Sequence, residues 1–159
     1  MAKKKEKTNV MRQLDSKKIA YKEHYYADTE AISGVEVAAE LNQNPDQVFK
    51  TLVTTGKSNQ HFVFMIPVAA ELDLKKAAKA VGEKSVEMLK AKELLELTGY
   101  VHGGCSPVGM KKFFRTTIQQ SAEAFETIIF SGGKIGFQVE LGLKDLARVI
   151  RFELGDVIK

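Results

Sequence analysis

VFKTLVTT (residues 48–55), GKSNQ (56–60) and HFVFMIPV (61–68) follow one another in the sequence and predict a β-hairpin at the centre of the fold. The first stretch is rich in β-branched residues, and the second contains glycine, serine and asparagine, which are typical of turns. The third stretch is apolar at consecutive positions, so this strand is either buried on both faces or part of a sheet that curls. We therefore expect other elements to cover the hairpin.

The remaining elements follow from hydrophobic periodicity and from capping and turn residues. Helices are expected at residues 9–17, 34–41, 74–81, 92–98 and 143–150. Strands are expected at 19–26, 86–88, 127–130 and 135–141, and residues 113–118 are irregular or extended. This arrangement predicts a mixed α/β fold, with a curled, barrel-like and largely antiparallel sheet surrounded by helices in a single domain of residues 1–159.

The composition is that of an ordinary globular protein, with 44% hydrophobic and 28% charged residues. Its apolar runs are too short to span a bilayer, and no apolar signal core follows the N-terminal lysines. The single cysteine cannot form an intramolecular disulfide, and three scattered histidines give no metal-ligand spacing. We expect a cytoplasmic protein without a membrane segment, a metal or a cofactor.

Positive charge is concentrated at the N-terminus. Residues 1–24 carry eight Lys or Arg against three Asp or Glu, whereas the whole chain has a net charge of +4. Residues 1–7 are expected to form a flexible basic tail, which is most often simply solvated. Lysines can also neutralise a nucleic-acid backbone without reading its sequence, so both roles stay open.

Lys50 is the one charged residue in the stretch 48–55. Period-two alternation puts it on the strand face of Val48 and Leu52, where a lysine must extend to water or meet a partner. It is therefore a candidate to hold a carbonyl, phosphate or ribose oxygen. Lysines on edge strands that discourage aggregation produce the same pattern.

Tyr26 and Cys105 are weaker candidates for chemistry. Tyr26 shares a predicted strand face with His24, and such a pair could act in acid–base catalysis, although a core tyrosine with a solvated hydroxyl gives the same pattern. Cys105 has no placed base beside it, and a reactive thiolate needs electropositive surroundings. The sequence does not favour Cys105 as a nucleophile.

The stretch GYVHGGCSPVG (99–109) is the first of two glycine-rich loops. Gly103 and Gly104 allow close approach to their backbone N–H groups, while Pro107 fixes its own φ and restricts Ser106 to extended geometry. Such a stiff loop suits a preorganised polar site. A plain connector between two elements has the same composition.

The second glycine-rich loop is the turn SGGK (131–134), in which Gly132 and Gly133 could present N–H groups to an anion or a carbonyl oxygen. The chain contains no P-loop, dinucleotide fingerprint, GxSxG elbow or HExxH motif. From the residues alone, a small polar ligand is plausible, and the reaction is not identified.

Five segments are YKEHYY (21–26), NPDQVFKTL (44–52), LDLKKAAKAVG (72–82), TGYVHGGCSPVG (98–109) and SGGK (131–134). In this order they resemble the YbaK/EbsC family of free-standing aminoacyl-tRNA deacylases, which is related to the editing domain inserted in bacterial prolyl-tRNA synthetases. The resemblance runs from about residue 8 to about residue 150 and is nearest to the Cys-tRNA(Pro) deacylase branch. It implies hydrolysis of mischarged Cys-tRNA(Pro). Because one small difference in an apolar pocket discriminates only ~10–200-fold, a second site is needed for fidelity.

The resemblance also implies a mechanism without a protein nucleophile. In this branch the cysteine thiol of the substrate attacks its own ester carbonyl and leaves as a thiolactone, so the enzyme supplies positioning and charge stabilisation. Lys50 matches the essential lysine of the family and would hold the ester or the terminal ribose. The implied substrate-binding residues are Tyr26, Thr51, Gly103, Gly104, Ser106, Pro107, Ser131, Gly132 and Gly133.

The sequence departs from the family pattern at Gln138, where some members have an aspartate, so an acidic contact there is in doubt. Two other functions stay open: a deacylase for another small aminoacyl group such as alanine, and a non-catalytic module that binds tRNA or a synthetase. Residues 25–159 carry sixteen basic and seventeen acidic side chains. This near-neutral balance suggests that prolyl-tRNA synthetase is a partner that supplies the choice of tRNA.

Overall fold

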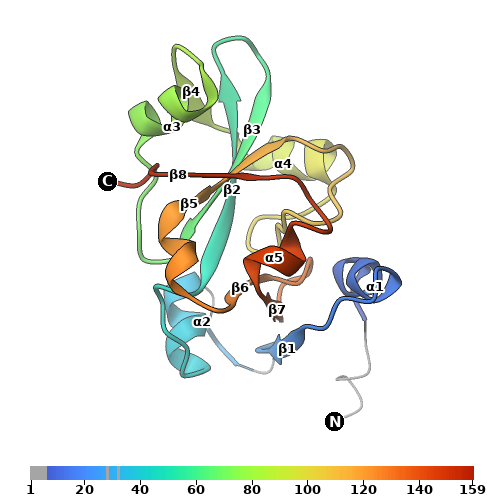
Figure 1. The fold of residues 1–159 in the computed structure, drawn as a ribbon. Helices are drawn as coiled ribbons and strands as arrows, with labels where there is room; N and C mark the ends of the chain where they lie inside the picture. Colours follow the sequence, from blue (N-terminus) through green and yellow to red (C-terminus); the bar gives the residue numbers. More distant parts are fainter. Residues whose placement is uncertain (1–6, 28, 32) are drawn as a thin grey trace.

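Two sheets form the centre of the structure, a computed structural model that describes residues 7–27, 29–31 and 33–159 (Figure 1). One sheet has five strands in the order β4-β2-β3-β5-β8, and the other has three in the order β1-β7-β6. The strands are β1 (Lys22–Tyr25), β2 (Phe49–Gly56), β3 (His61–Pro67), β4 (Val86–Met88), β5 (Arg115–Gln119), β6 (Ile128–Ser131), β7 (Phe137–Leu141) and β8 (Glu153–Gly155). The predicted mixed α/β fold is confirmed.

Several helices begin or end at residues that are suited to capping. They are α1 (Asn9–Ser16), α2 (Gly34–Glu40), α3 (Leu74–Val81), α4 (Ala91–Thr98), the 3-10 helix η2 (Gln120–Ala124) and α5 (Leu143–Leu146). Ser33 and Glu36 form the predicted capping box of α2, and Gly82 and Gly99 end α3 and α4 in the left-handed conformation. Among the described residues, no helix has the length and apolarity needed to cross a membrane.

The predicted hairpin is confirmed as the antiparallel pair β2–β3, and both of its faces are covered. Phe49 and Val53 face the larger hydrophobic cluster, which also contains residues of α1 and of the three-stranded sheet. Phe64 and Ile66 face a second cluster, formed with α3. Two-sided burial explains why residues 61–68 are apolar at consecutive positions.

The expected barrel-like closure is wrong, because the two sheets remain open and separate. Between β2 and β6 the contact is one parallel bridge, Val48 with Ile129, supported by the hydrogen bond from the Ile129 N–H to the Gln47 carbonyl (3.0 Å). Ala38 of α2 and Val68 pack on this bridge. Among the described residues no further bridge joins these two strands, and β4 and β8 form the edges of the larger sheet.

Three other predictions need correction. Residues 113–118 contain the central strand β5, which pairs in parallel with β3 and β8. The sequence of β5, RTTIQ, does not indicate a central strand, because two of its buried positions are threonines instead of apolar residues. Strand β8 was not predicted, since three residues carry no readable alternation, and α5 ends at Leu146 instead of residue 150.

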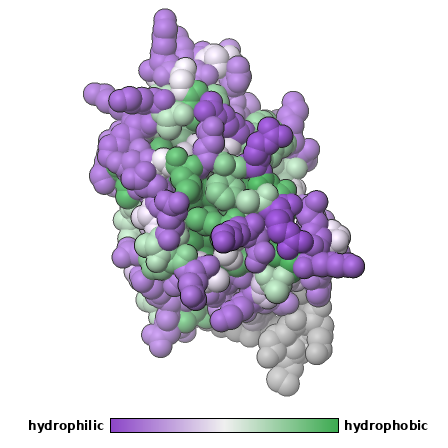
Figure 2. All heavy atoms as spheres, viewed as in Figure 1, coloured by the Kyte–Doolittle hydropathy of each residue, from purple (hydrophilic) through white to green (hydrophobic). Residues whose placement is uncertain are grey.

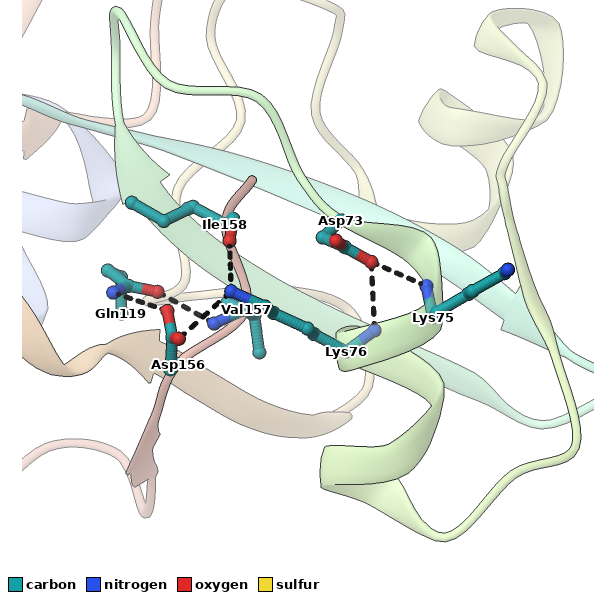
Figure 3. A network of polar contacts seen from close by, with 7 residues as sticks. All are labelled: Asp73, Lys75, Lys76, Gln119, Asp156, Val157 and Ile158. Atoms are coloured by element: carbon teal, nitrogen blue, oxygen red, sulfur yellow. Dashed lines mark hydrogen bonds and ion pairs between the residues drawn. The ribbon is translucent and has the colours of Figure 1, made fainter.

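A network of polar contacts attaches the C-terminal segment to α3 and β5 (Figure 3). The Lys76 ammonium binds the Asp156 carboxylate (3.0 Å) and the Ile158 carbonyl (2.8 Å). Gln119 donates to Asp156 (3.1 Å) and accepts from the Val157 N–H (2.8 Å). These contacts, made after the end of β8, hold a short strand that has little apolar surface of its own.

Polar and charged residues surround the face seen in Figure 1, and apolar residues reach the surface in its middle, where β8 and α5 lie (Figure 2). Leu154 of β8 is one exposed apolar residue, at 38%. Of the expected basic tail, residues 1–6 lie outside the described residues. Lys7 is described, and its ammonium contacts the Asp15 carboxylate of α1.

Two adjacent buried threonines of β5 allow a matched stability test. Thr116 and Thr117 are each 2% exposed; the Thr116 hydroxyl donates to the Phe114 carbonyl (2.9 Å), but the Thr117 hydroxyl has no partner among the described residues. We expect Thr117→Val to raise the free energy of unfolding by about 1 kcal/mol, because an unpaired buried hydroxyl is removed. Thr116→Val is expected to lower it by a similar amount, as measured by urea unfolding. Equal effects of the two substitutions would contradict this account.

Candidate active site

A row of polar side chains crosses the outer face of the three-stranded sheet. Gln138 of β7 lies opposite His24 of β1 and opposite Ser131 of β6, so the three side chains share one face. The other face is apolar: the Tyr25 ring packs edge-on against the Phe137 ring, with 5.1 Å between the ring centroids, and Phe137 belongs to the larger cluster, against which Tyr25 packs. The polar row is therefore the face of this sheet that can receive a ligand.

Tyr26 extends this row at the end of β1. It is buried, at 8% exposed, and strand alternation puts it on the same side as His24. Its N–H donates to the carbonyl of Gly136 (2.8 Å), so β1 stays attached to the loop between β6 and β7. The predicted grouping of Tyr26 with His24 fits this register, while His24 is already bound to Glu140 (2.8 Å).

Lys50 reaches the row from the other sheet. The bridge pairs Val48 with Ile129 in parallel, so strand register puts Lys50 and Ser131, each two residues later, at the same level. Lys50 is half-buried, and burial lowers its pKa below the ordinary value of 10.5, an effect that the Glu71 carboxylate partly offsets. A half-buried ammonium where two sheets meet can bind an oxygen of a ligand.

The first glycine-rich loop packs against the second. A Cβ on Gly104 would lie 3.1 Å from the N atom of Ile135, and one on exposed Gly103, whose φ is +90°, would lie 3.7 Å from the Ile135 side chain. Glycine at 104 thus permits the close approach of the two loops. The structure brings Gly103 and Gly104 next to Ile135, directly after the 131–134 turn.

The expected donor role of these glycines is not supported by the hydrogen bonds. The Gly104 N–H donates to the Val101 carbonyl (3.0 Å), and the Gly132 N–H donates to the Phe137 carbonyl (2.8 Å). The Gly133 N–H donates to the Ser131 hydroxyl oxygen (3.0 Å). Because each of these N–H groups is already bonded inside its own turn, these three glycines shape the site instead of donating to a ligand.

The structure also gives the surroundings of three other predicted substrate-binding residues. Thr51 is on the opposite face of β2, with Phe49, and its hydroxyl oxygen is buried without a partner among the described residues. Ser106 is fully buried, and its hydroxyl oxygen accepts from the Val108 N–H (3.3 Å). Pro107 lines a separate hollow of about 200 Å³, beside residues of the 109–116 stretch. The sequence could not separate the two faces of the loop.

Cys105 is poorly suited to nucleophilic attack. Its side chain is buried in the larger cluster, at 7% exposed. Burial raises the pKa of the Cys105 thiol to about 12, while a hydrogen bond with Thr98 acts in the opposite sense. The thiol is therefore protonated at neutral pH, in agreement with the sequence analysis. Within the described residues, no three His, Cys, Asp or Glu side chains gather as a metal site.

Gln43 is a site residue that the sequence analysis missed. It follows α2, is partly buried, and donates from its Nε2 to the Oε1 of Gln138 (2.8 Å). In the sequence it stands just before the Asn44–Asp46 turn, where a glutamine usually indicates an exposed loop. Only the packing of α2 over the polar row identifies it.

Glu140 anchors the neighbouring row of the same sheet face. Its carboxylate binds His24 (2.8 Å) and the Thr127 hydroxyl (2.5 Å). Burial acts to raise the pKa of Glu140, but these two hydrogen bonds outweigh it and lower the pKa below the ordinary value of 4.5. A carboxylate whose pKa is lowered on folding stabilises the folded protein above its unfolded pKa, and this contribution is lost as the pH falls through the folded pKa.

Glu140→Gln is therefore expected to lower stability at pH 7 and to flatten the loss of stability between roughly pH 5 and pH 3. Thermal unfolding across this pH range measures both effects. Glu23→Gln, at an exposed position of β1, serves as the control and should change stability by less than about 0.5 kcal/mol. If Glu140→Gln kept the pH dependence of the original protein, the assignment of the acid-sensitive group would be wrong.

Comparisons with known proteins identify the family of this chain. Residues 29–149 match the family described as "Aminoacyl-tRNA editing domain". The chain is 49% identical over 144 residues to the Enterococcus faecalis protein named "Putative Cys-tRNA(Pro)/Cys-tRNA(Cys) deacylase EbsC", covering 89% of this chain and 88% of that protein. It is 30% identical over 114 residues to the "Uncharacterized protein YwhH" of Bacillus subtilis, covering 71% and 72% of the two chains.

Solved structures give the same fold. The structure described as "Crystal structure of a putative trans-editing enzyme for prolyl tRNA synthetase" superposes with a TM-score of 0.83 and 21% identity, covering 97% of this chain and 99% of the other. At that identity the likeness concerns the fold alone. The family match spans most of the chain and includes Lys50, the Gly103–Gly104 loop and the Ser131–Gly133 turn. The chain therefore belongs to the YbaK-like family of aminoacyl-tRNA editing domains.

Proposed function

We propose that the protein hydrolyses mischarged Cys-tRNA(Pro) and that the cysteine thiol of the substrate is the attacking group. The observation that carries this proposal is the position of Lys50, which is half-buried and, by the register of the Val48–Ile129 bridge, level with Ser131 where the two sheets meet. Family membership supports deacylation of an aminoacyl-tRNA, and the name of the Enterococcus relative supports a cysteinyl ester.

The site supplies charge and shape more readily than a nucleophile. The Ser131 hydroxyl oxygen accepts from the Gly133 N–H, and Cys105 is buried and protonated. An ammonium at Lys50 would bind the ester carbonyl oxygen and stabilise the negative charge that develops there. Tyr26, Gly103 and Gly104 would bound the space for the aminoacyl group, while Thr51, Ser106 and Pro107 would support it from the core side.

In the proposed reaction the substrate sulfur gives up its proton and forms a bond to its own ester carbonyl carbon. The bond from that carbon to the ribose oxygen then breaks, and the ribose oxygen takes up a proton. The tRNA leaves with a free terminal hydroxyl, and cysteine leaves as a thiolactone that water opens. Holding the thiol near the carbonyl makes the attack intramolecular, which is where most of the rate gain arises.

The proposed substrate also indicates where the protein acts and with which partner. Aminoacyl-tRNAs occur in the cytoplasm, so we place the protein there. The near-neutral charge of residues 25–159 favours a prolyl-tRNA synthetase as the partner that selects the tRNA. Tight and salt-sensitive binding of free tRNA by the protein alone would argue against this division of labour.

Release of amino acid from Cys-tRNA(Pro), Ser-tRNA(Pro) and Ala-tRNA(Pro) tests the proposal. We expect rapid loss of cysteine only, and a drop of about 100-fold or more for Lys50→Met, because the main charge at the ester is removed. Lys57→Met, in the exposed β2–β3 turn, is the control and should keep full activity. Equal release of serine or alanine would indicate attack by water, and no release of any amino acid would favour a binding module.

Lys50→Met is also expected to leave the free energy of unfolding unchanged or slightly higher, because a half-buried ammonium with a lowered pKa is replaced by an apolar group. Urea unfolding measures this effect. A clear loss of stability would mean that Lys50 holds the fold, and the loss of activity would then need another explanation.

Cys105→Ala tests whether the attacking thiol belongs to the substrate. We expect deacylation within about threefold of the original rate, because the buried thiol takes no part in the reaction, while stability falls slightly with the lost core volume. A loss of activity as large as that of Lys50→Met, in a folded variant, would assign the thiol chemistry to the protein instead.

A further inference from the structure

Gln43 and Gln138 form an amide pair beside the proposed site. The Nε2 of Gln43 donates to the Oε1 of Gln138 over 2.8 Å, and Gln138 is 5% exposed. Gln138 lies in the polar row between His24 and Ser131. Gln43 comes from the segment after α2, so the pair ties this segment to the sheet face that carries the row.

This hydrogen bond fixes which end of the Gln138 amide faces the row. Its oxygen is held by Gln43, so its NH₂ group must point elsewhere. No described residue accepts from that nitrogen, and it is not among the fully buried atoms that lack a partner. The NH₂ group is therefore a hydrogen-bond donor that is oriented by the protein and available to a ligand beside Ser131.

Gln43 contributes little to stability by this arrangement. Its own Oε1 is buried and has no partner among the described residues. An unpaired buried acceptor offsets the gain from the one hydrogen bond that Gln43 makes. An unpaired buried oxygen in a native structure calls for an explanation, and a role in binding supplies one that a role in folding does not.

We propose that Gln43 is a positioning residue and that Gln138 is a substrate-binding residue, whose amide NH₂ donates to an oxygen of the aminoacyl ester together with Lys50. This inference rests on the proposed function, since the ester is the ligand of that site. Under this proposal the Gln138 NH₂ group is a neutral hydrogen-bond donor. The site therefore binds an oxygen of the substrate at this position and does not bind an ammonium group there.

Two glutamines four positions apart in the sequence allow a matched experiment. Gln47 is also partly buried, but its Nε2 donates to the carbonyl and hydroxyl oxygens of Thr127, at the far end of β6. We expect Gln43→Leu to lower kcat on Cys-tRNA(Pro) about tenfold with little change in melting temperature. We expect Gln47→Leu to lower the melting temperature by about 3 °C and to keep kcat within about twofold.

Gln43→Glu supplies a second readout that a structural role would not move. Above its own pKa the new carboxylate cannot donate, and it would accept from the Gln138 NH₂ and turn the amide around. We expect kcat of this variant to be low at pH 7.5 and to recover as the pH is lowered and the carboxyl is protonated. The original protein should not gain activity over the same range.

The outcomes separate this inference from the proposed function. Unchanged kcat in Gln43→Leu, or equal losses of activity and stability in Gln43→Leu and Gln47→Leu, would overturn the positioning role. If the original protein released no amino acid, the proposed function would fail, and NMR of the Gln138 side-chain amide would still test the positioning. A clear change in the chemical shifts of the two Gln138 amide protons in Gln43→Leu would support it, and signals that do not change would overturn it.

Discussion

The arrangement of the molecule depends on the single bridge between Val48 and Ile129. At this point a backbone bridge joins the five-stranded and three-stranded sheets, and Ala38 and Val68 cover it with apolar surface. The same two sheets pack through Phe49 and Val53 in the larger cluster. On the other face of β2, register puts Lys50 level with Ser131, and the neighbouring sheet explains how a lysine in an otherwise apolar strand is half-buried.

The two faces of the three-stranded sheet have different tasks. One face packs Tyr25 and Phe137 into the larger cluster and fixes the sheet against α1 and the first glycine-rich loop. The other carries His24, Gln138 and Ser131, together with the Glu140 network, under α2. Because strand alternation separates the faces strictly, polar chemistry and core packing can share three short strands without conflict.

The glycines of both loops matter because they lack a side chain and permit close packing. Their N–H groups are not the feature that serves the site. Gly104, Gly132 and Gly133 have bonded N–H groups, and the close approach at Gly104 lets the loop reach the turn that follows Ser131. The charge in the site is then supplied by side chains on strands. Strands hold such side chains more precisely than loops do, which suits a reaction that relies on positioning.

The sequence by itself determined the hairpin β2–β3, the N-caps of α1 to α3, the glycine ends of α3 and α4, the mixed α/β class and the unusual position of a lysine in an apolar strand, because these depend on local alternation, capping chemistry and one charge in an apolar run. Tertiary structure alone decided the open sheets, the central strand β5, the edge strand β8 and the burial of Ser106. It also decided the pairing of Gln43 with Gln138. These features arise from contacts between residues far apart in the chain, and their local sequences carry no signal of the partner.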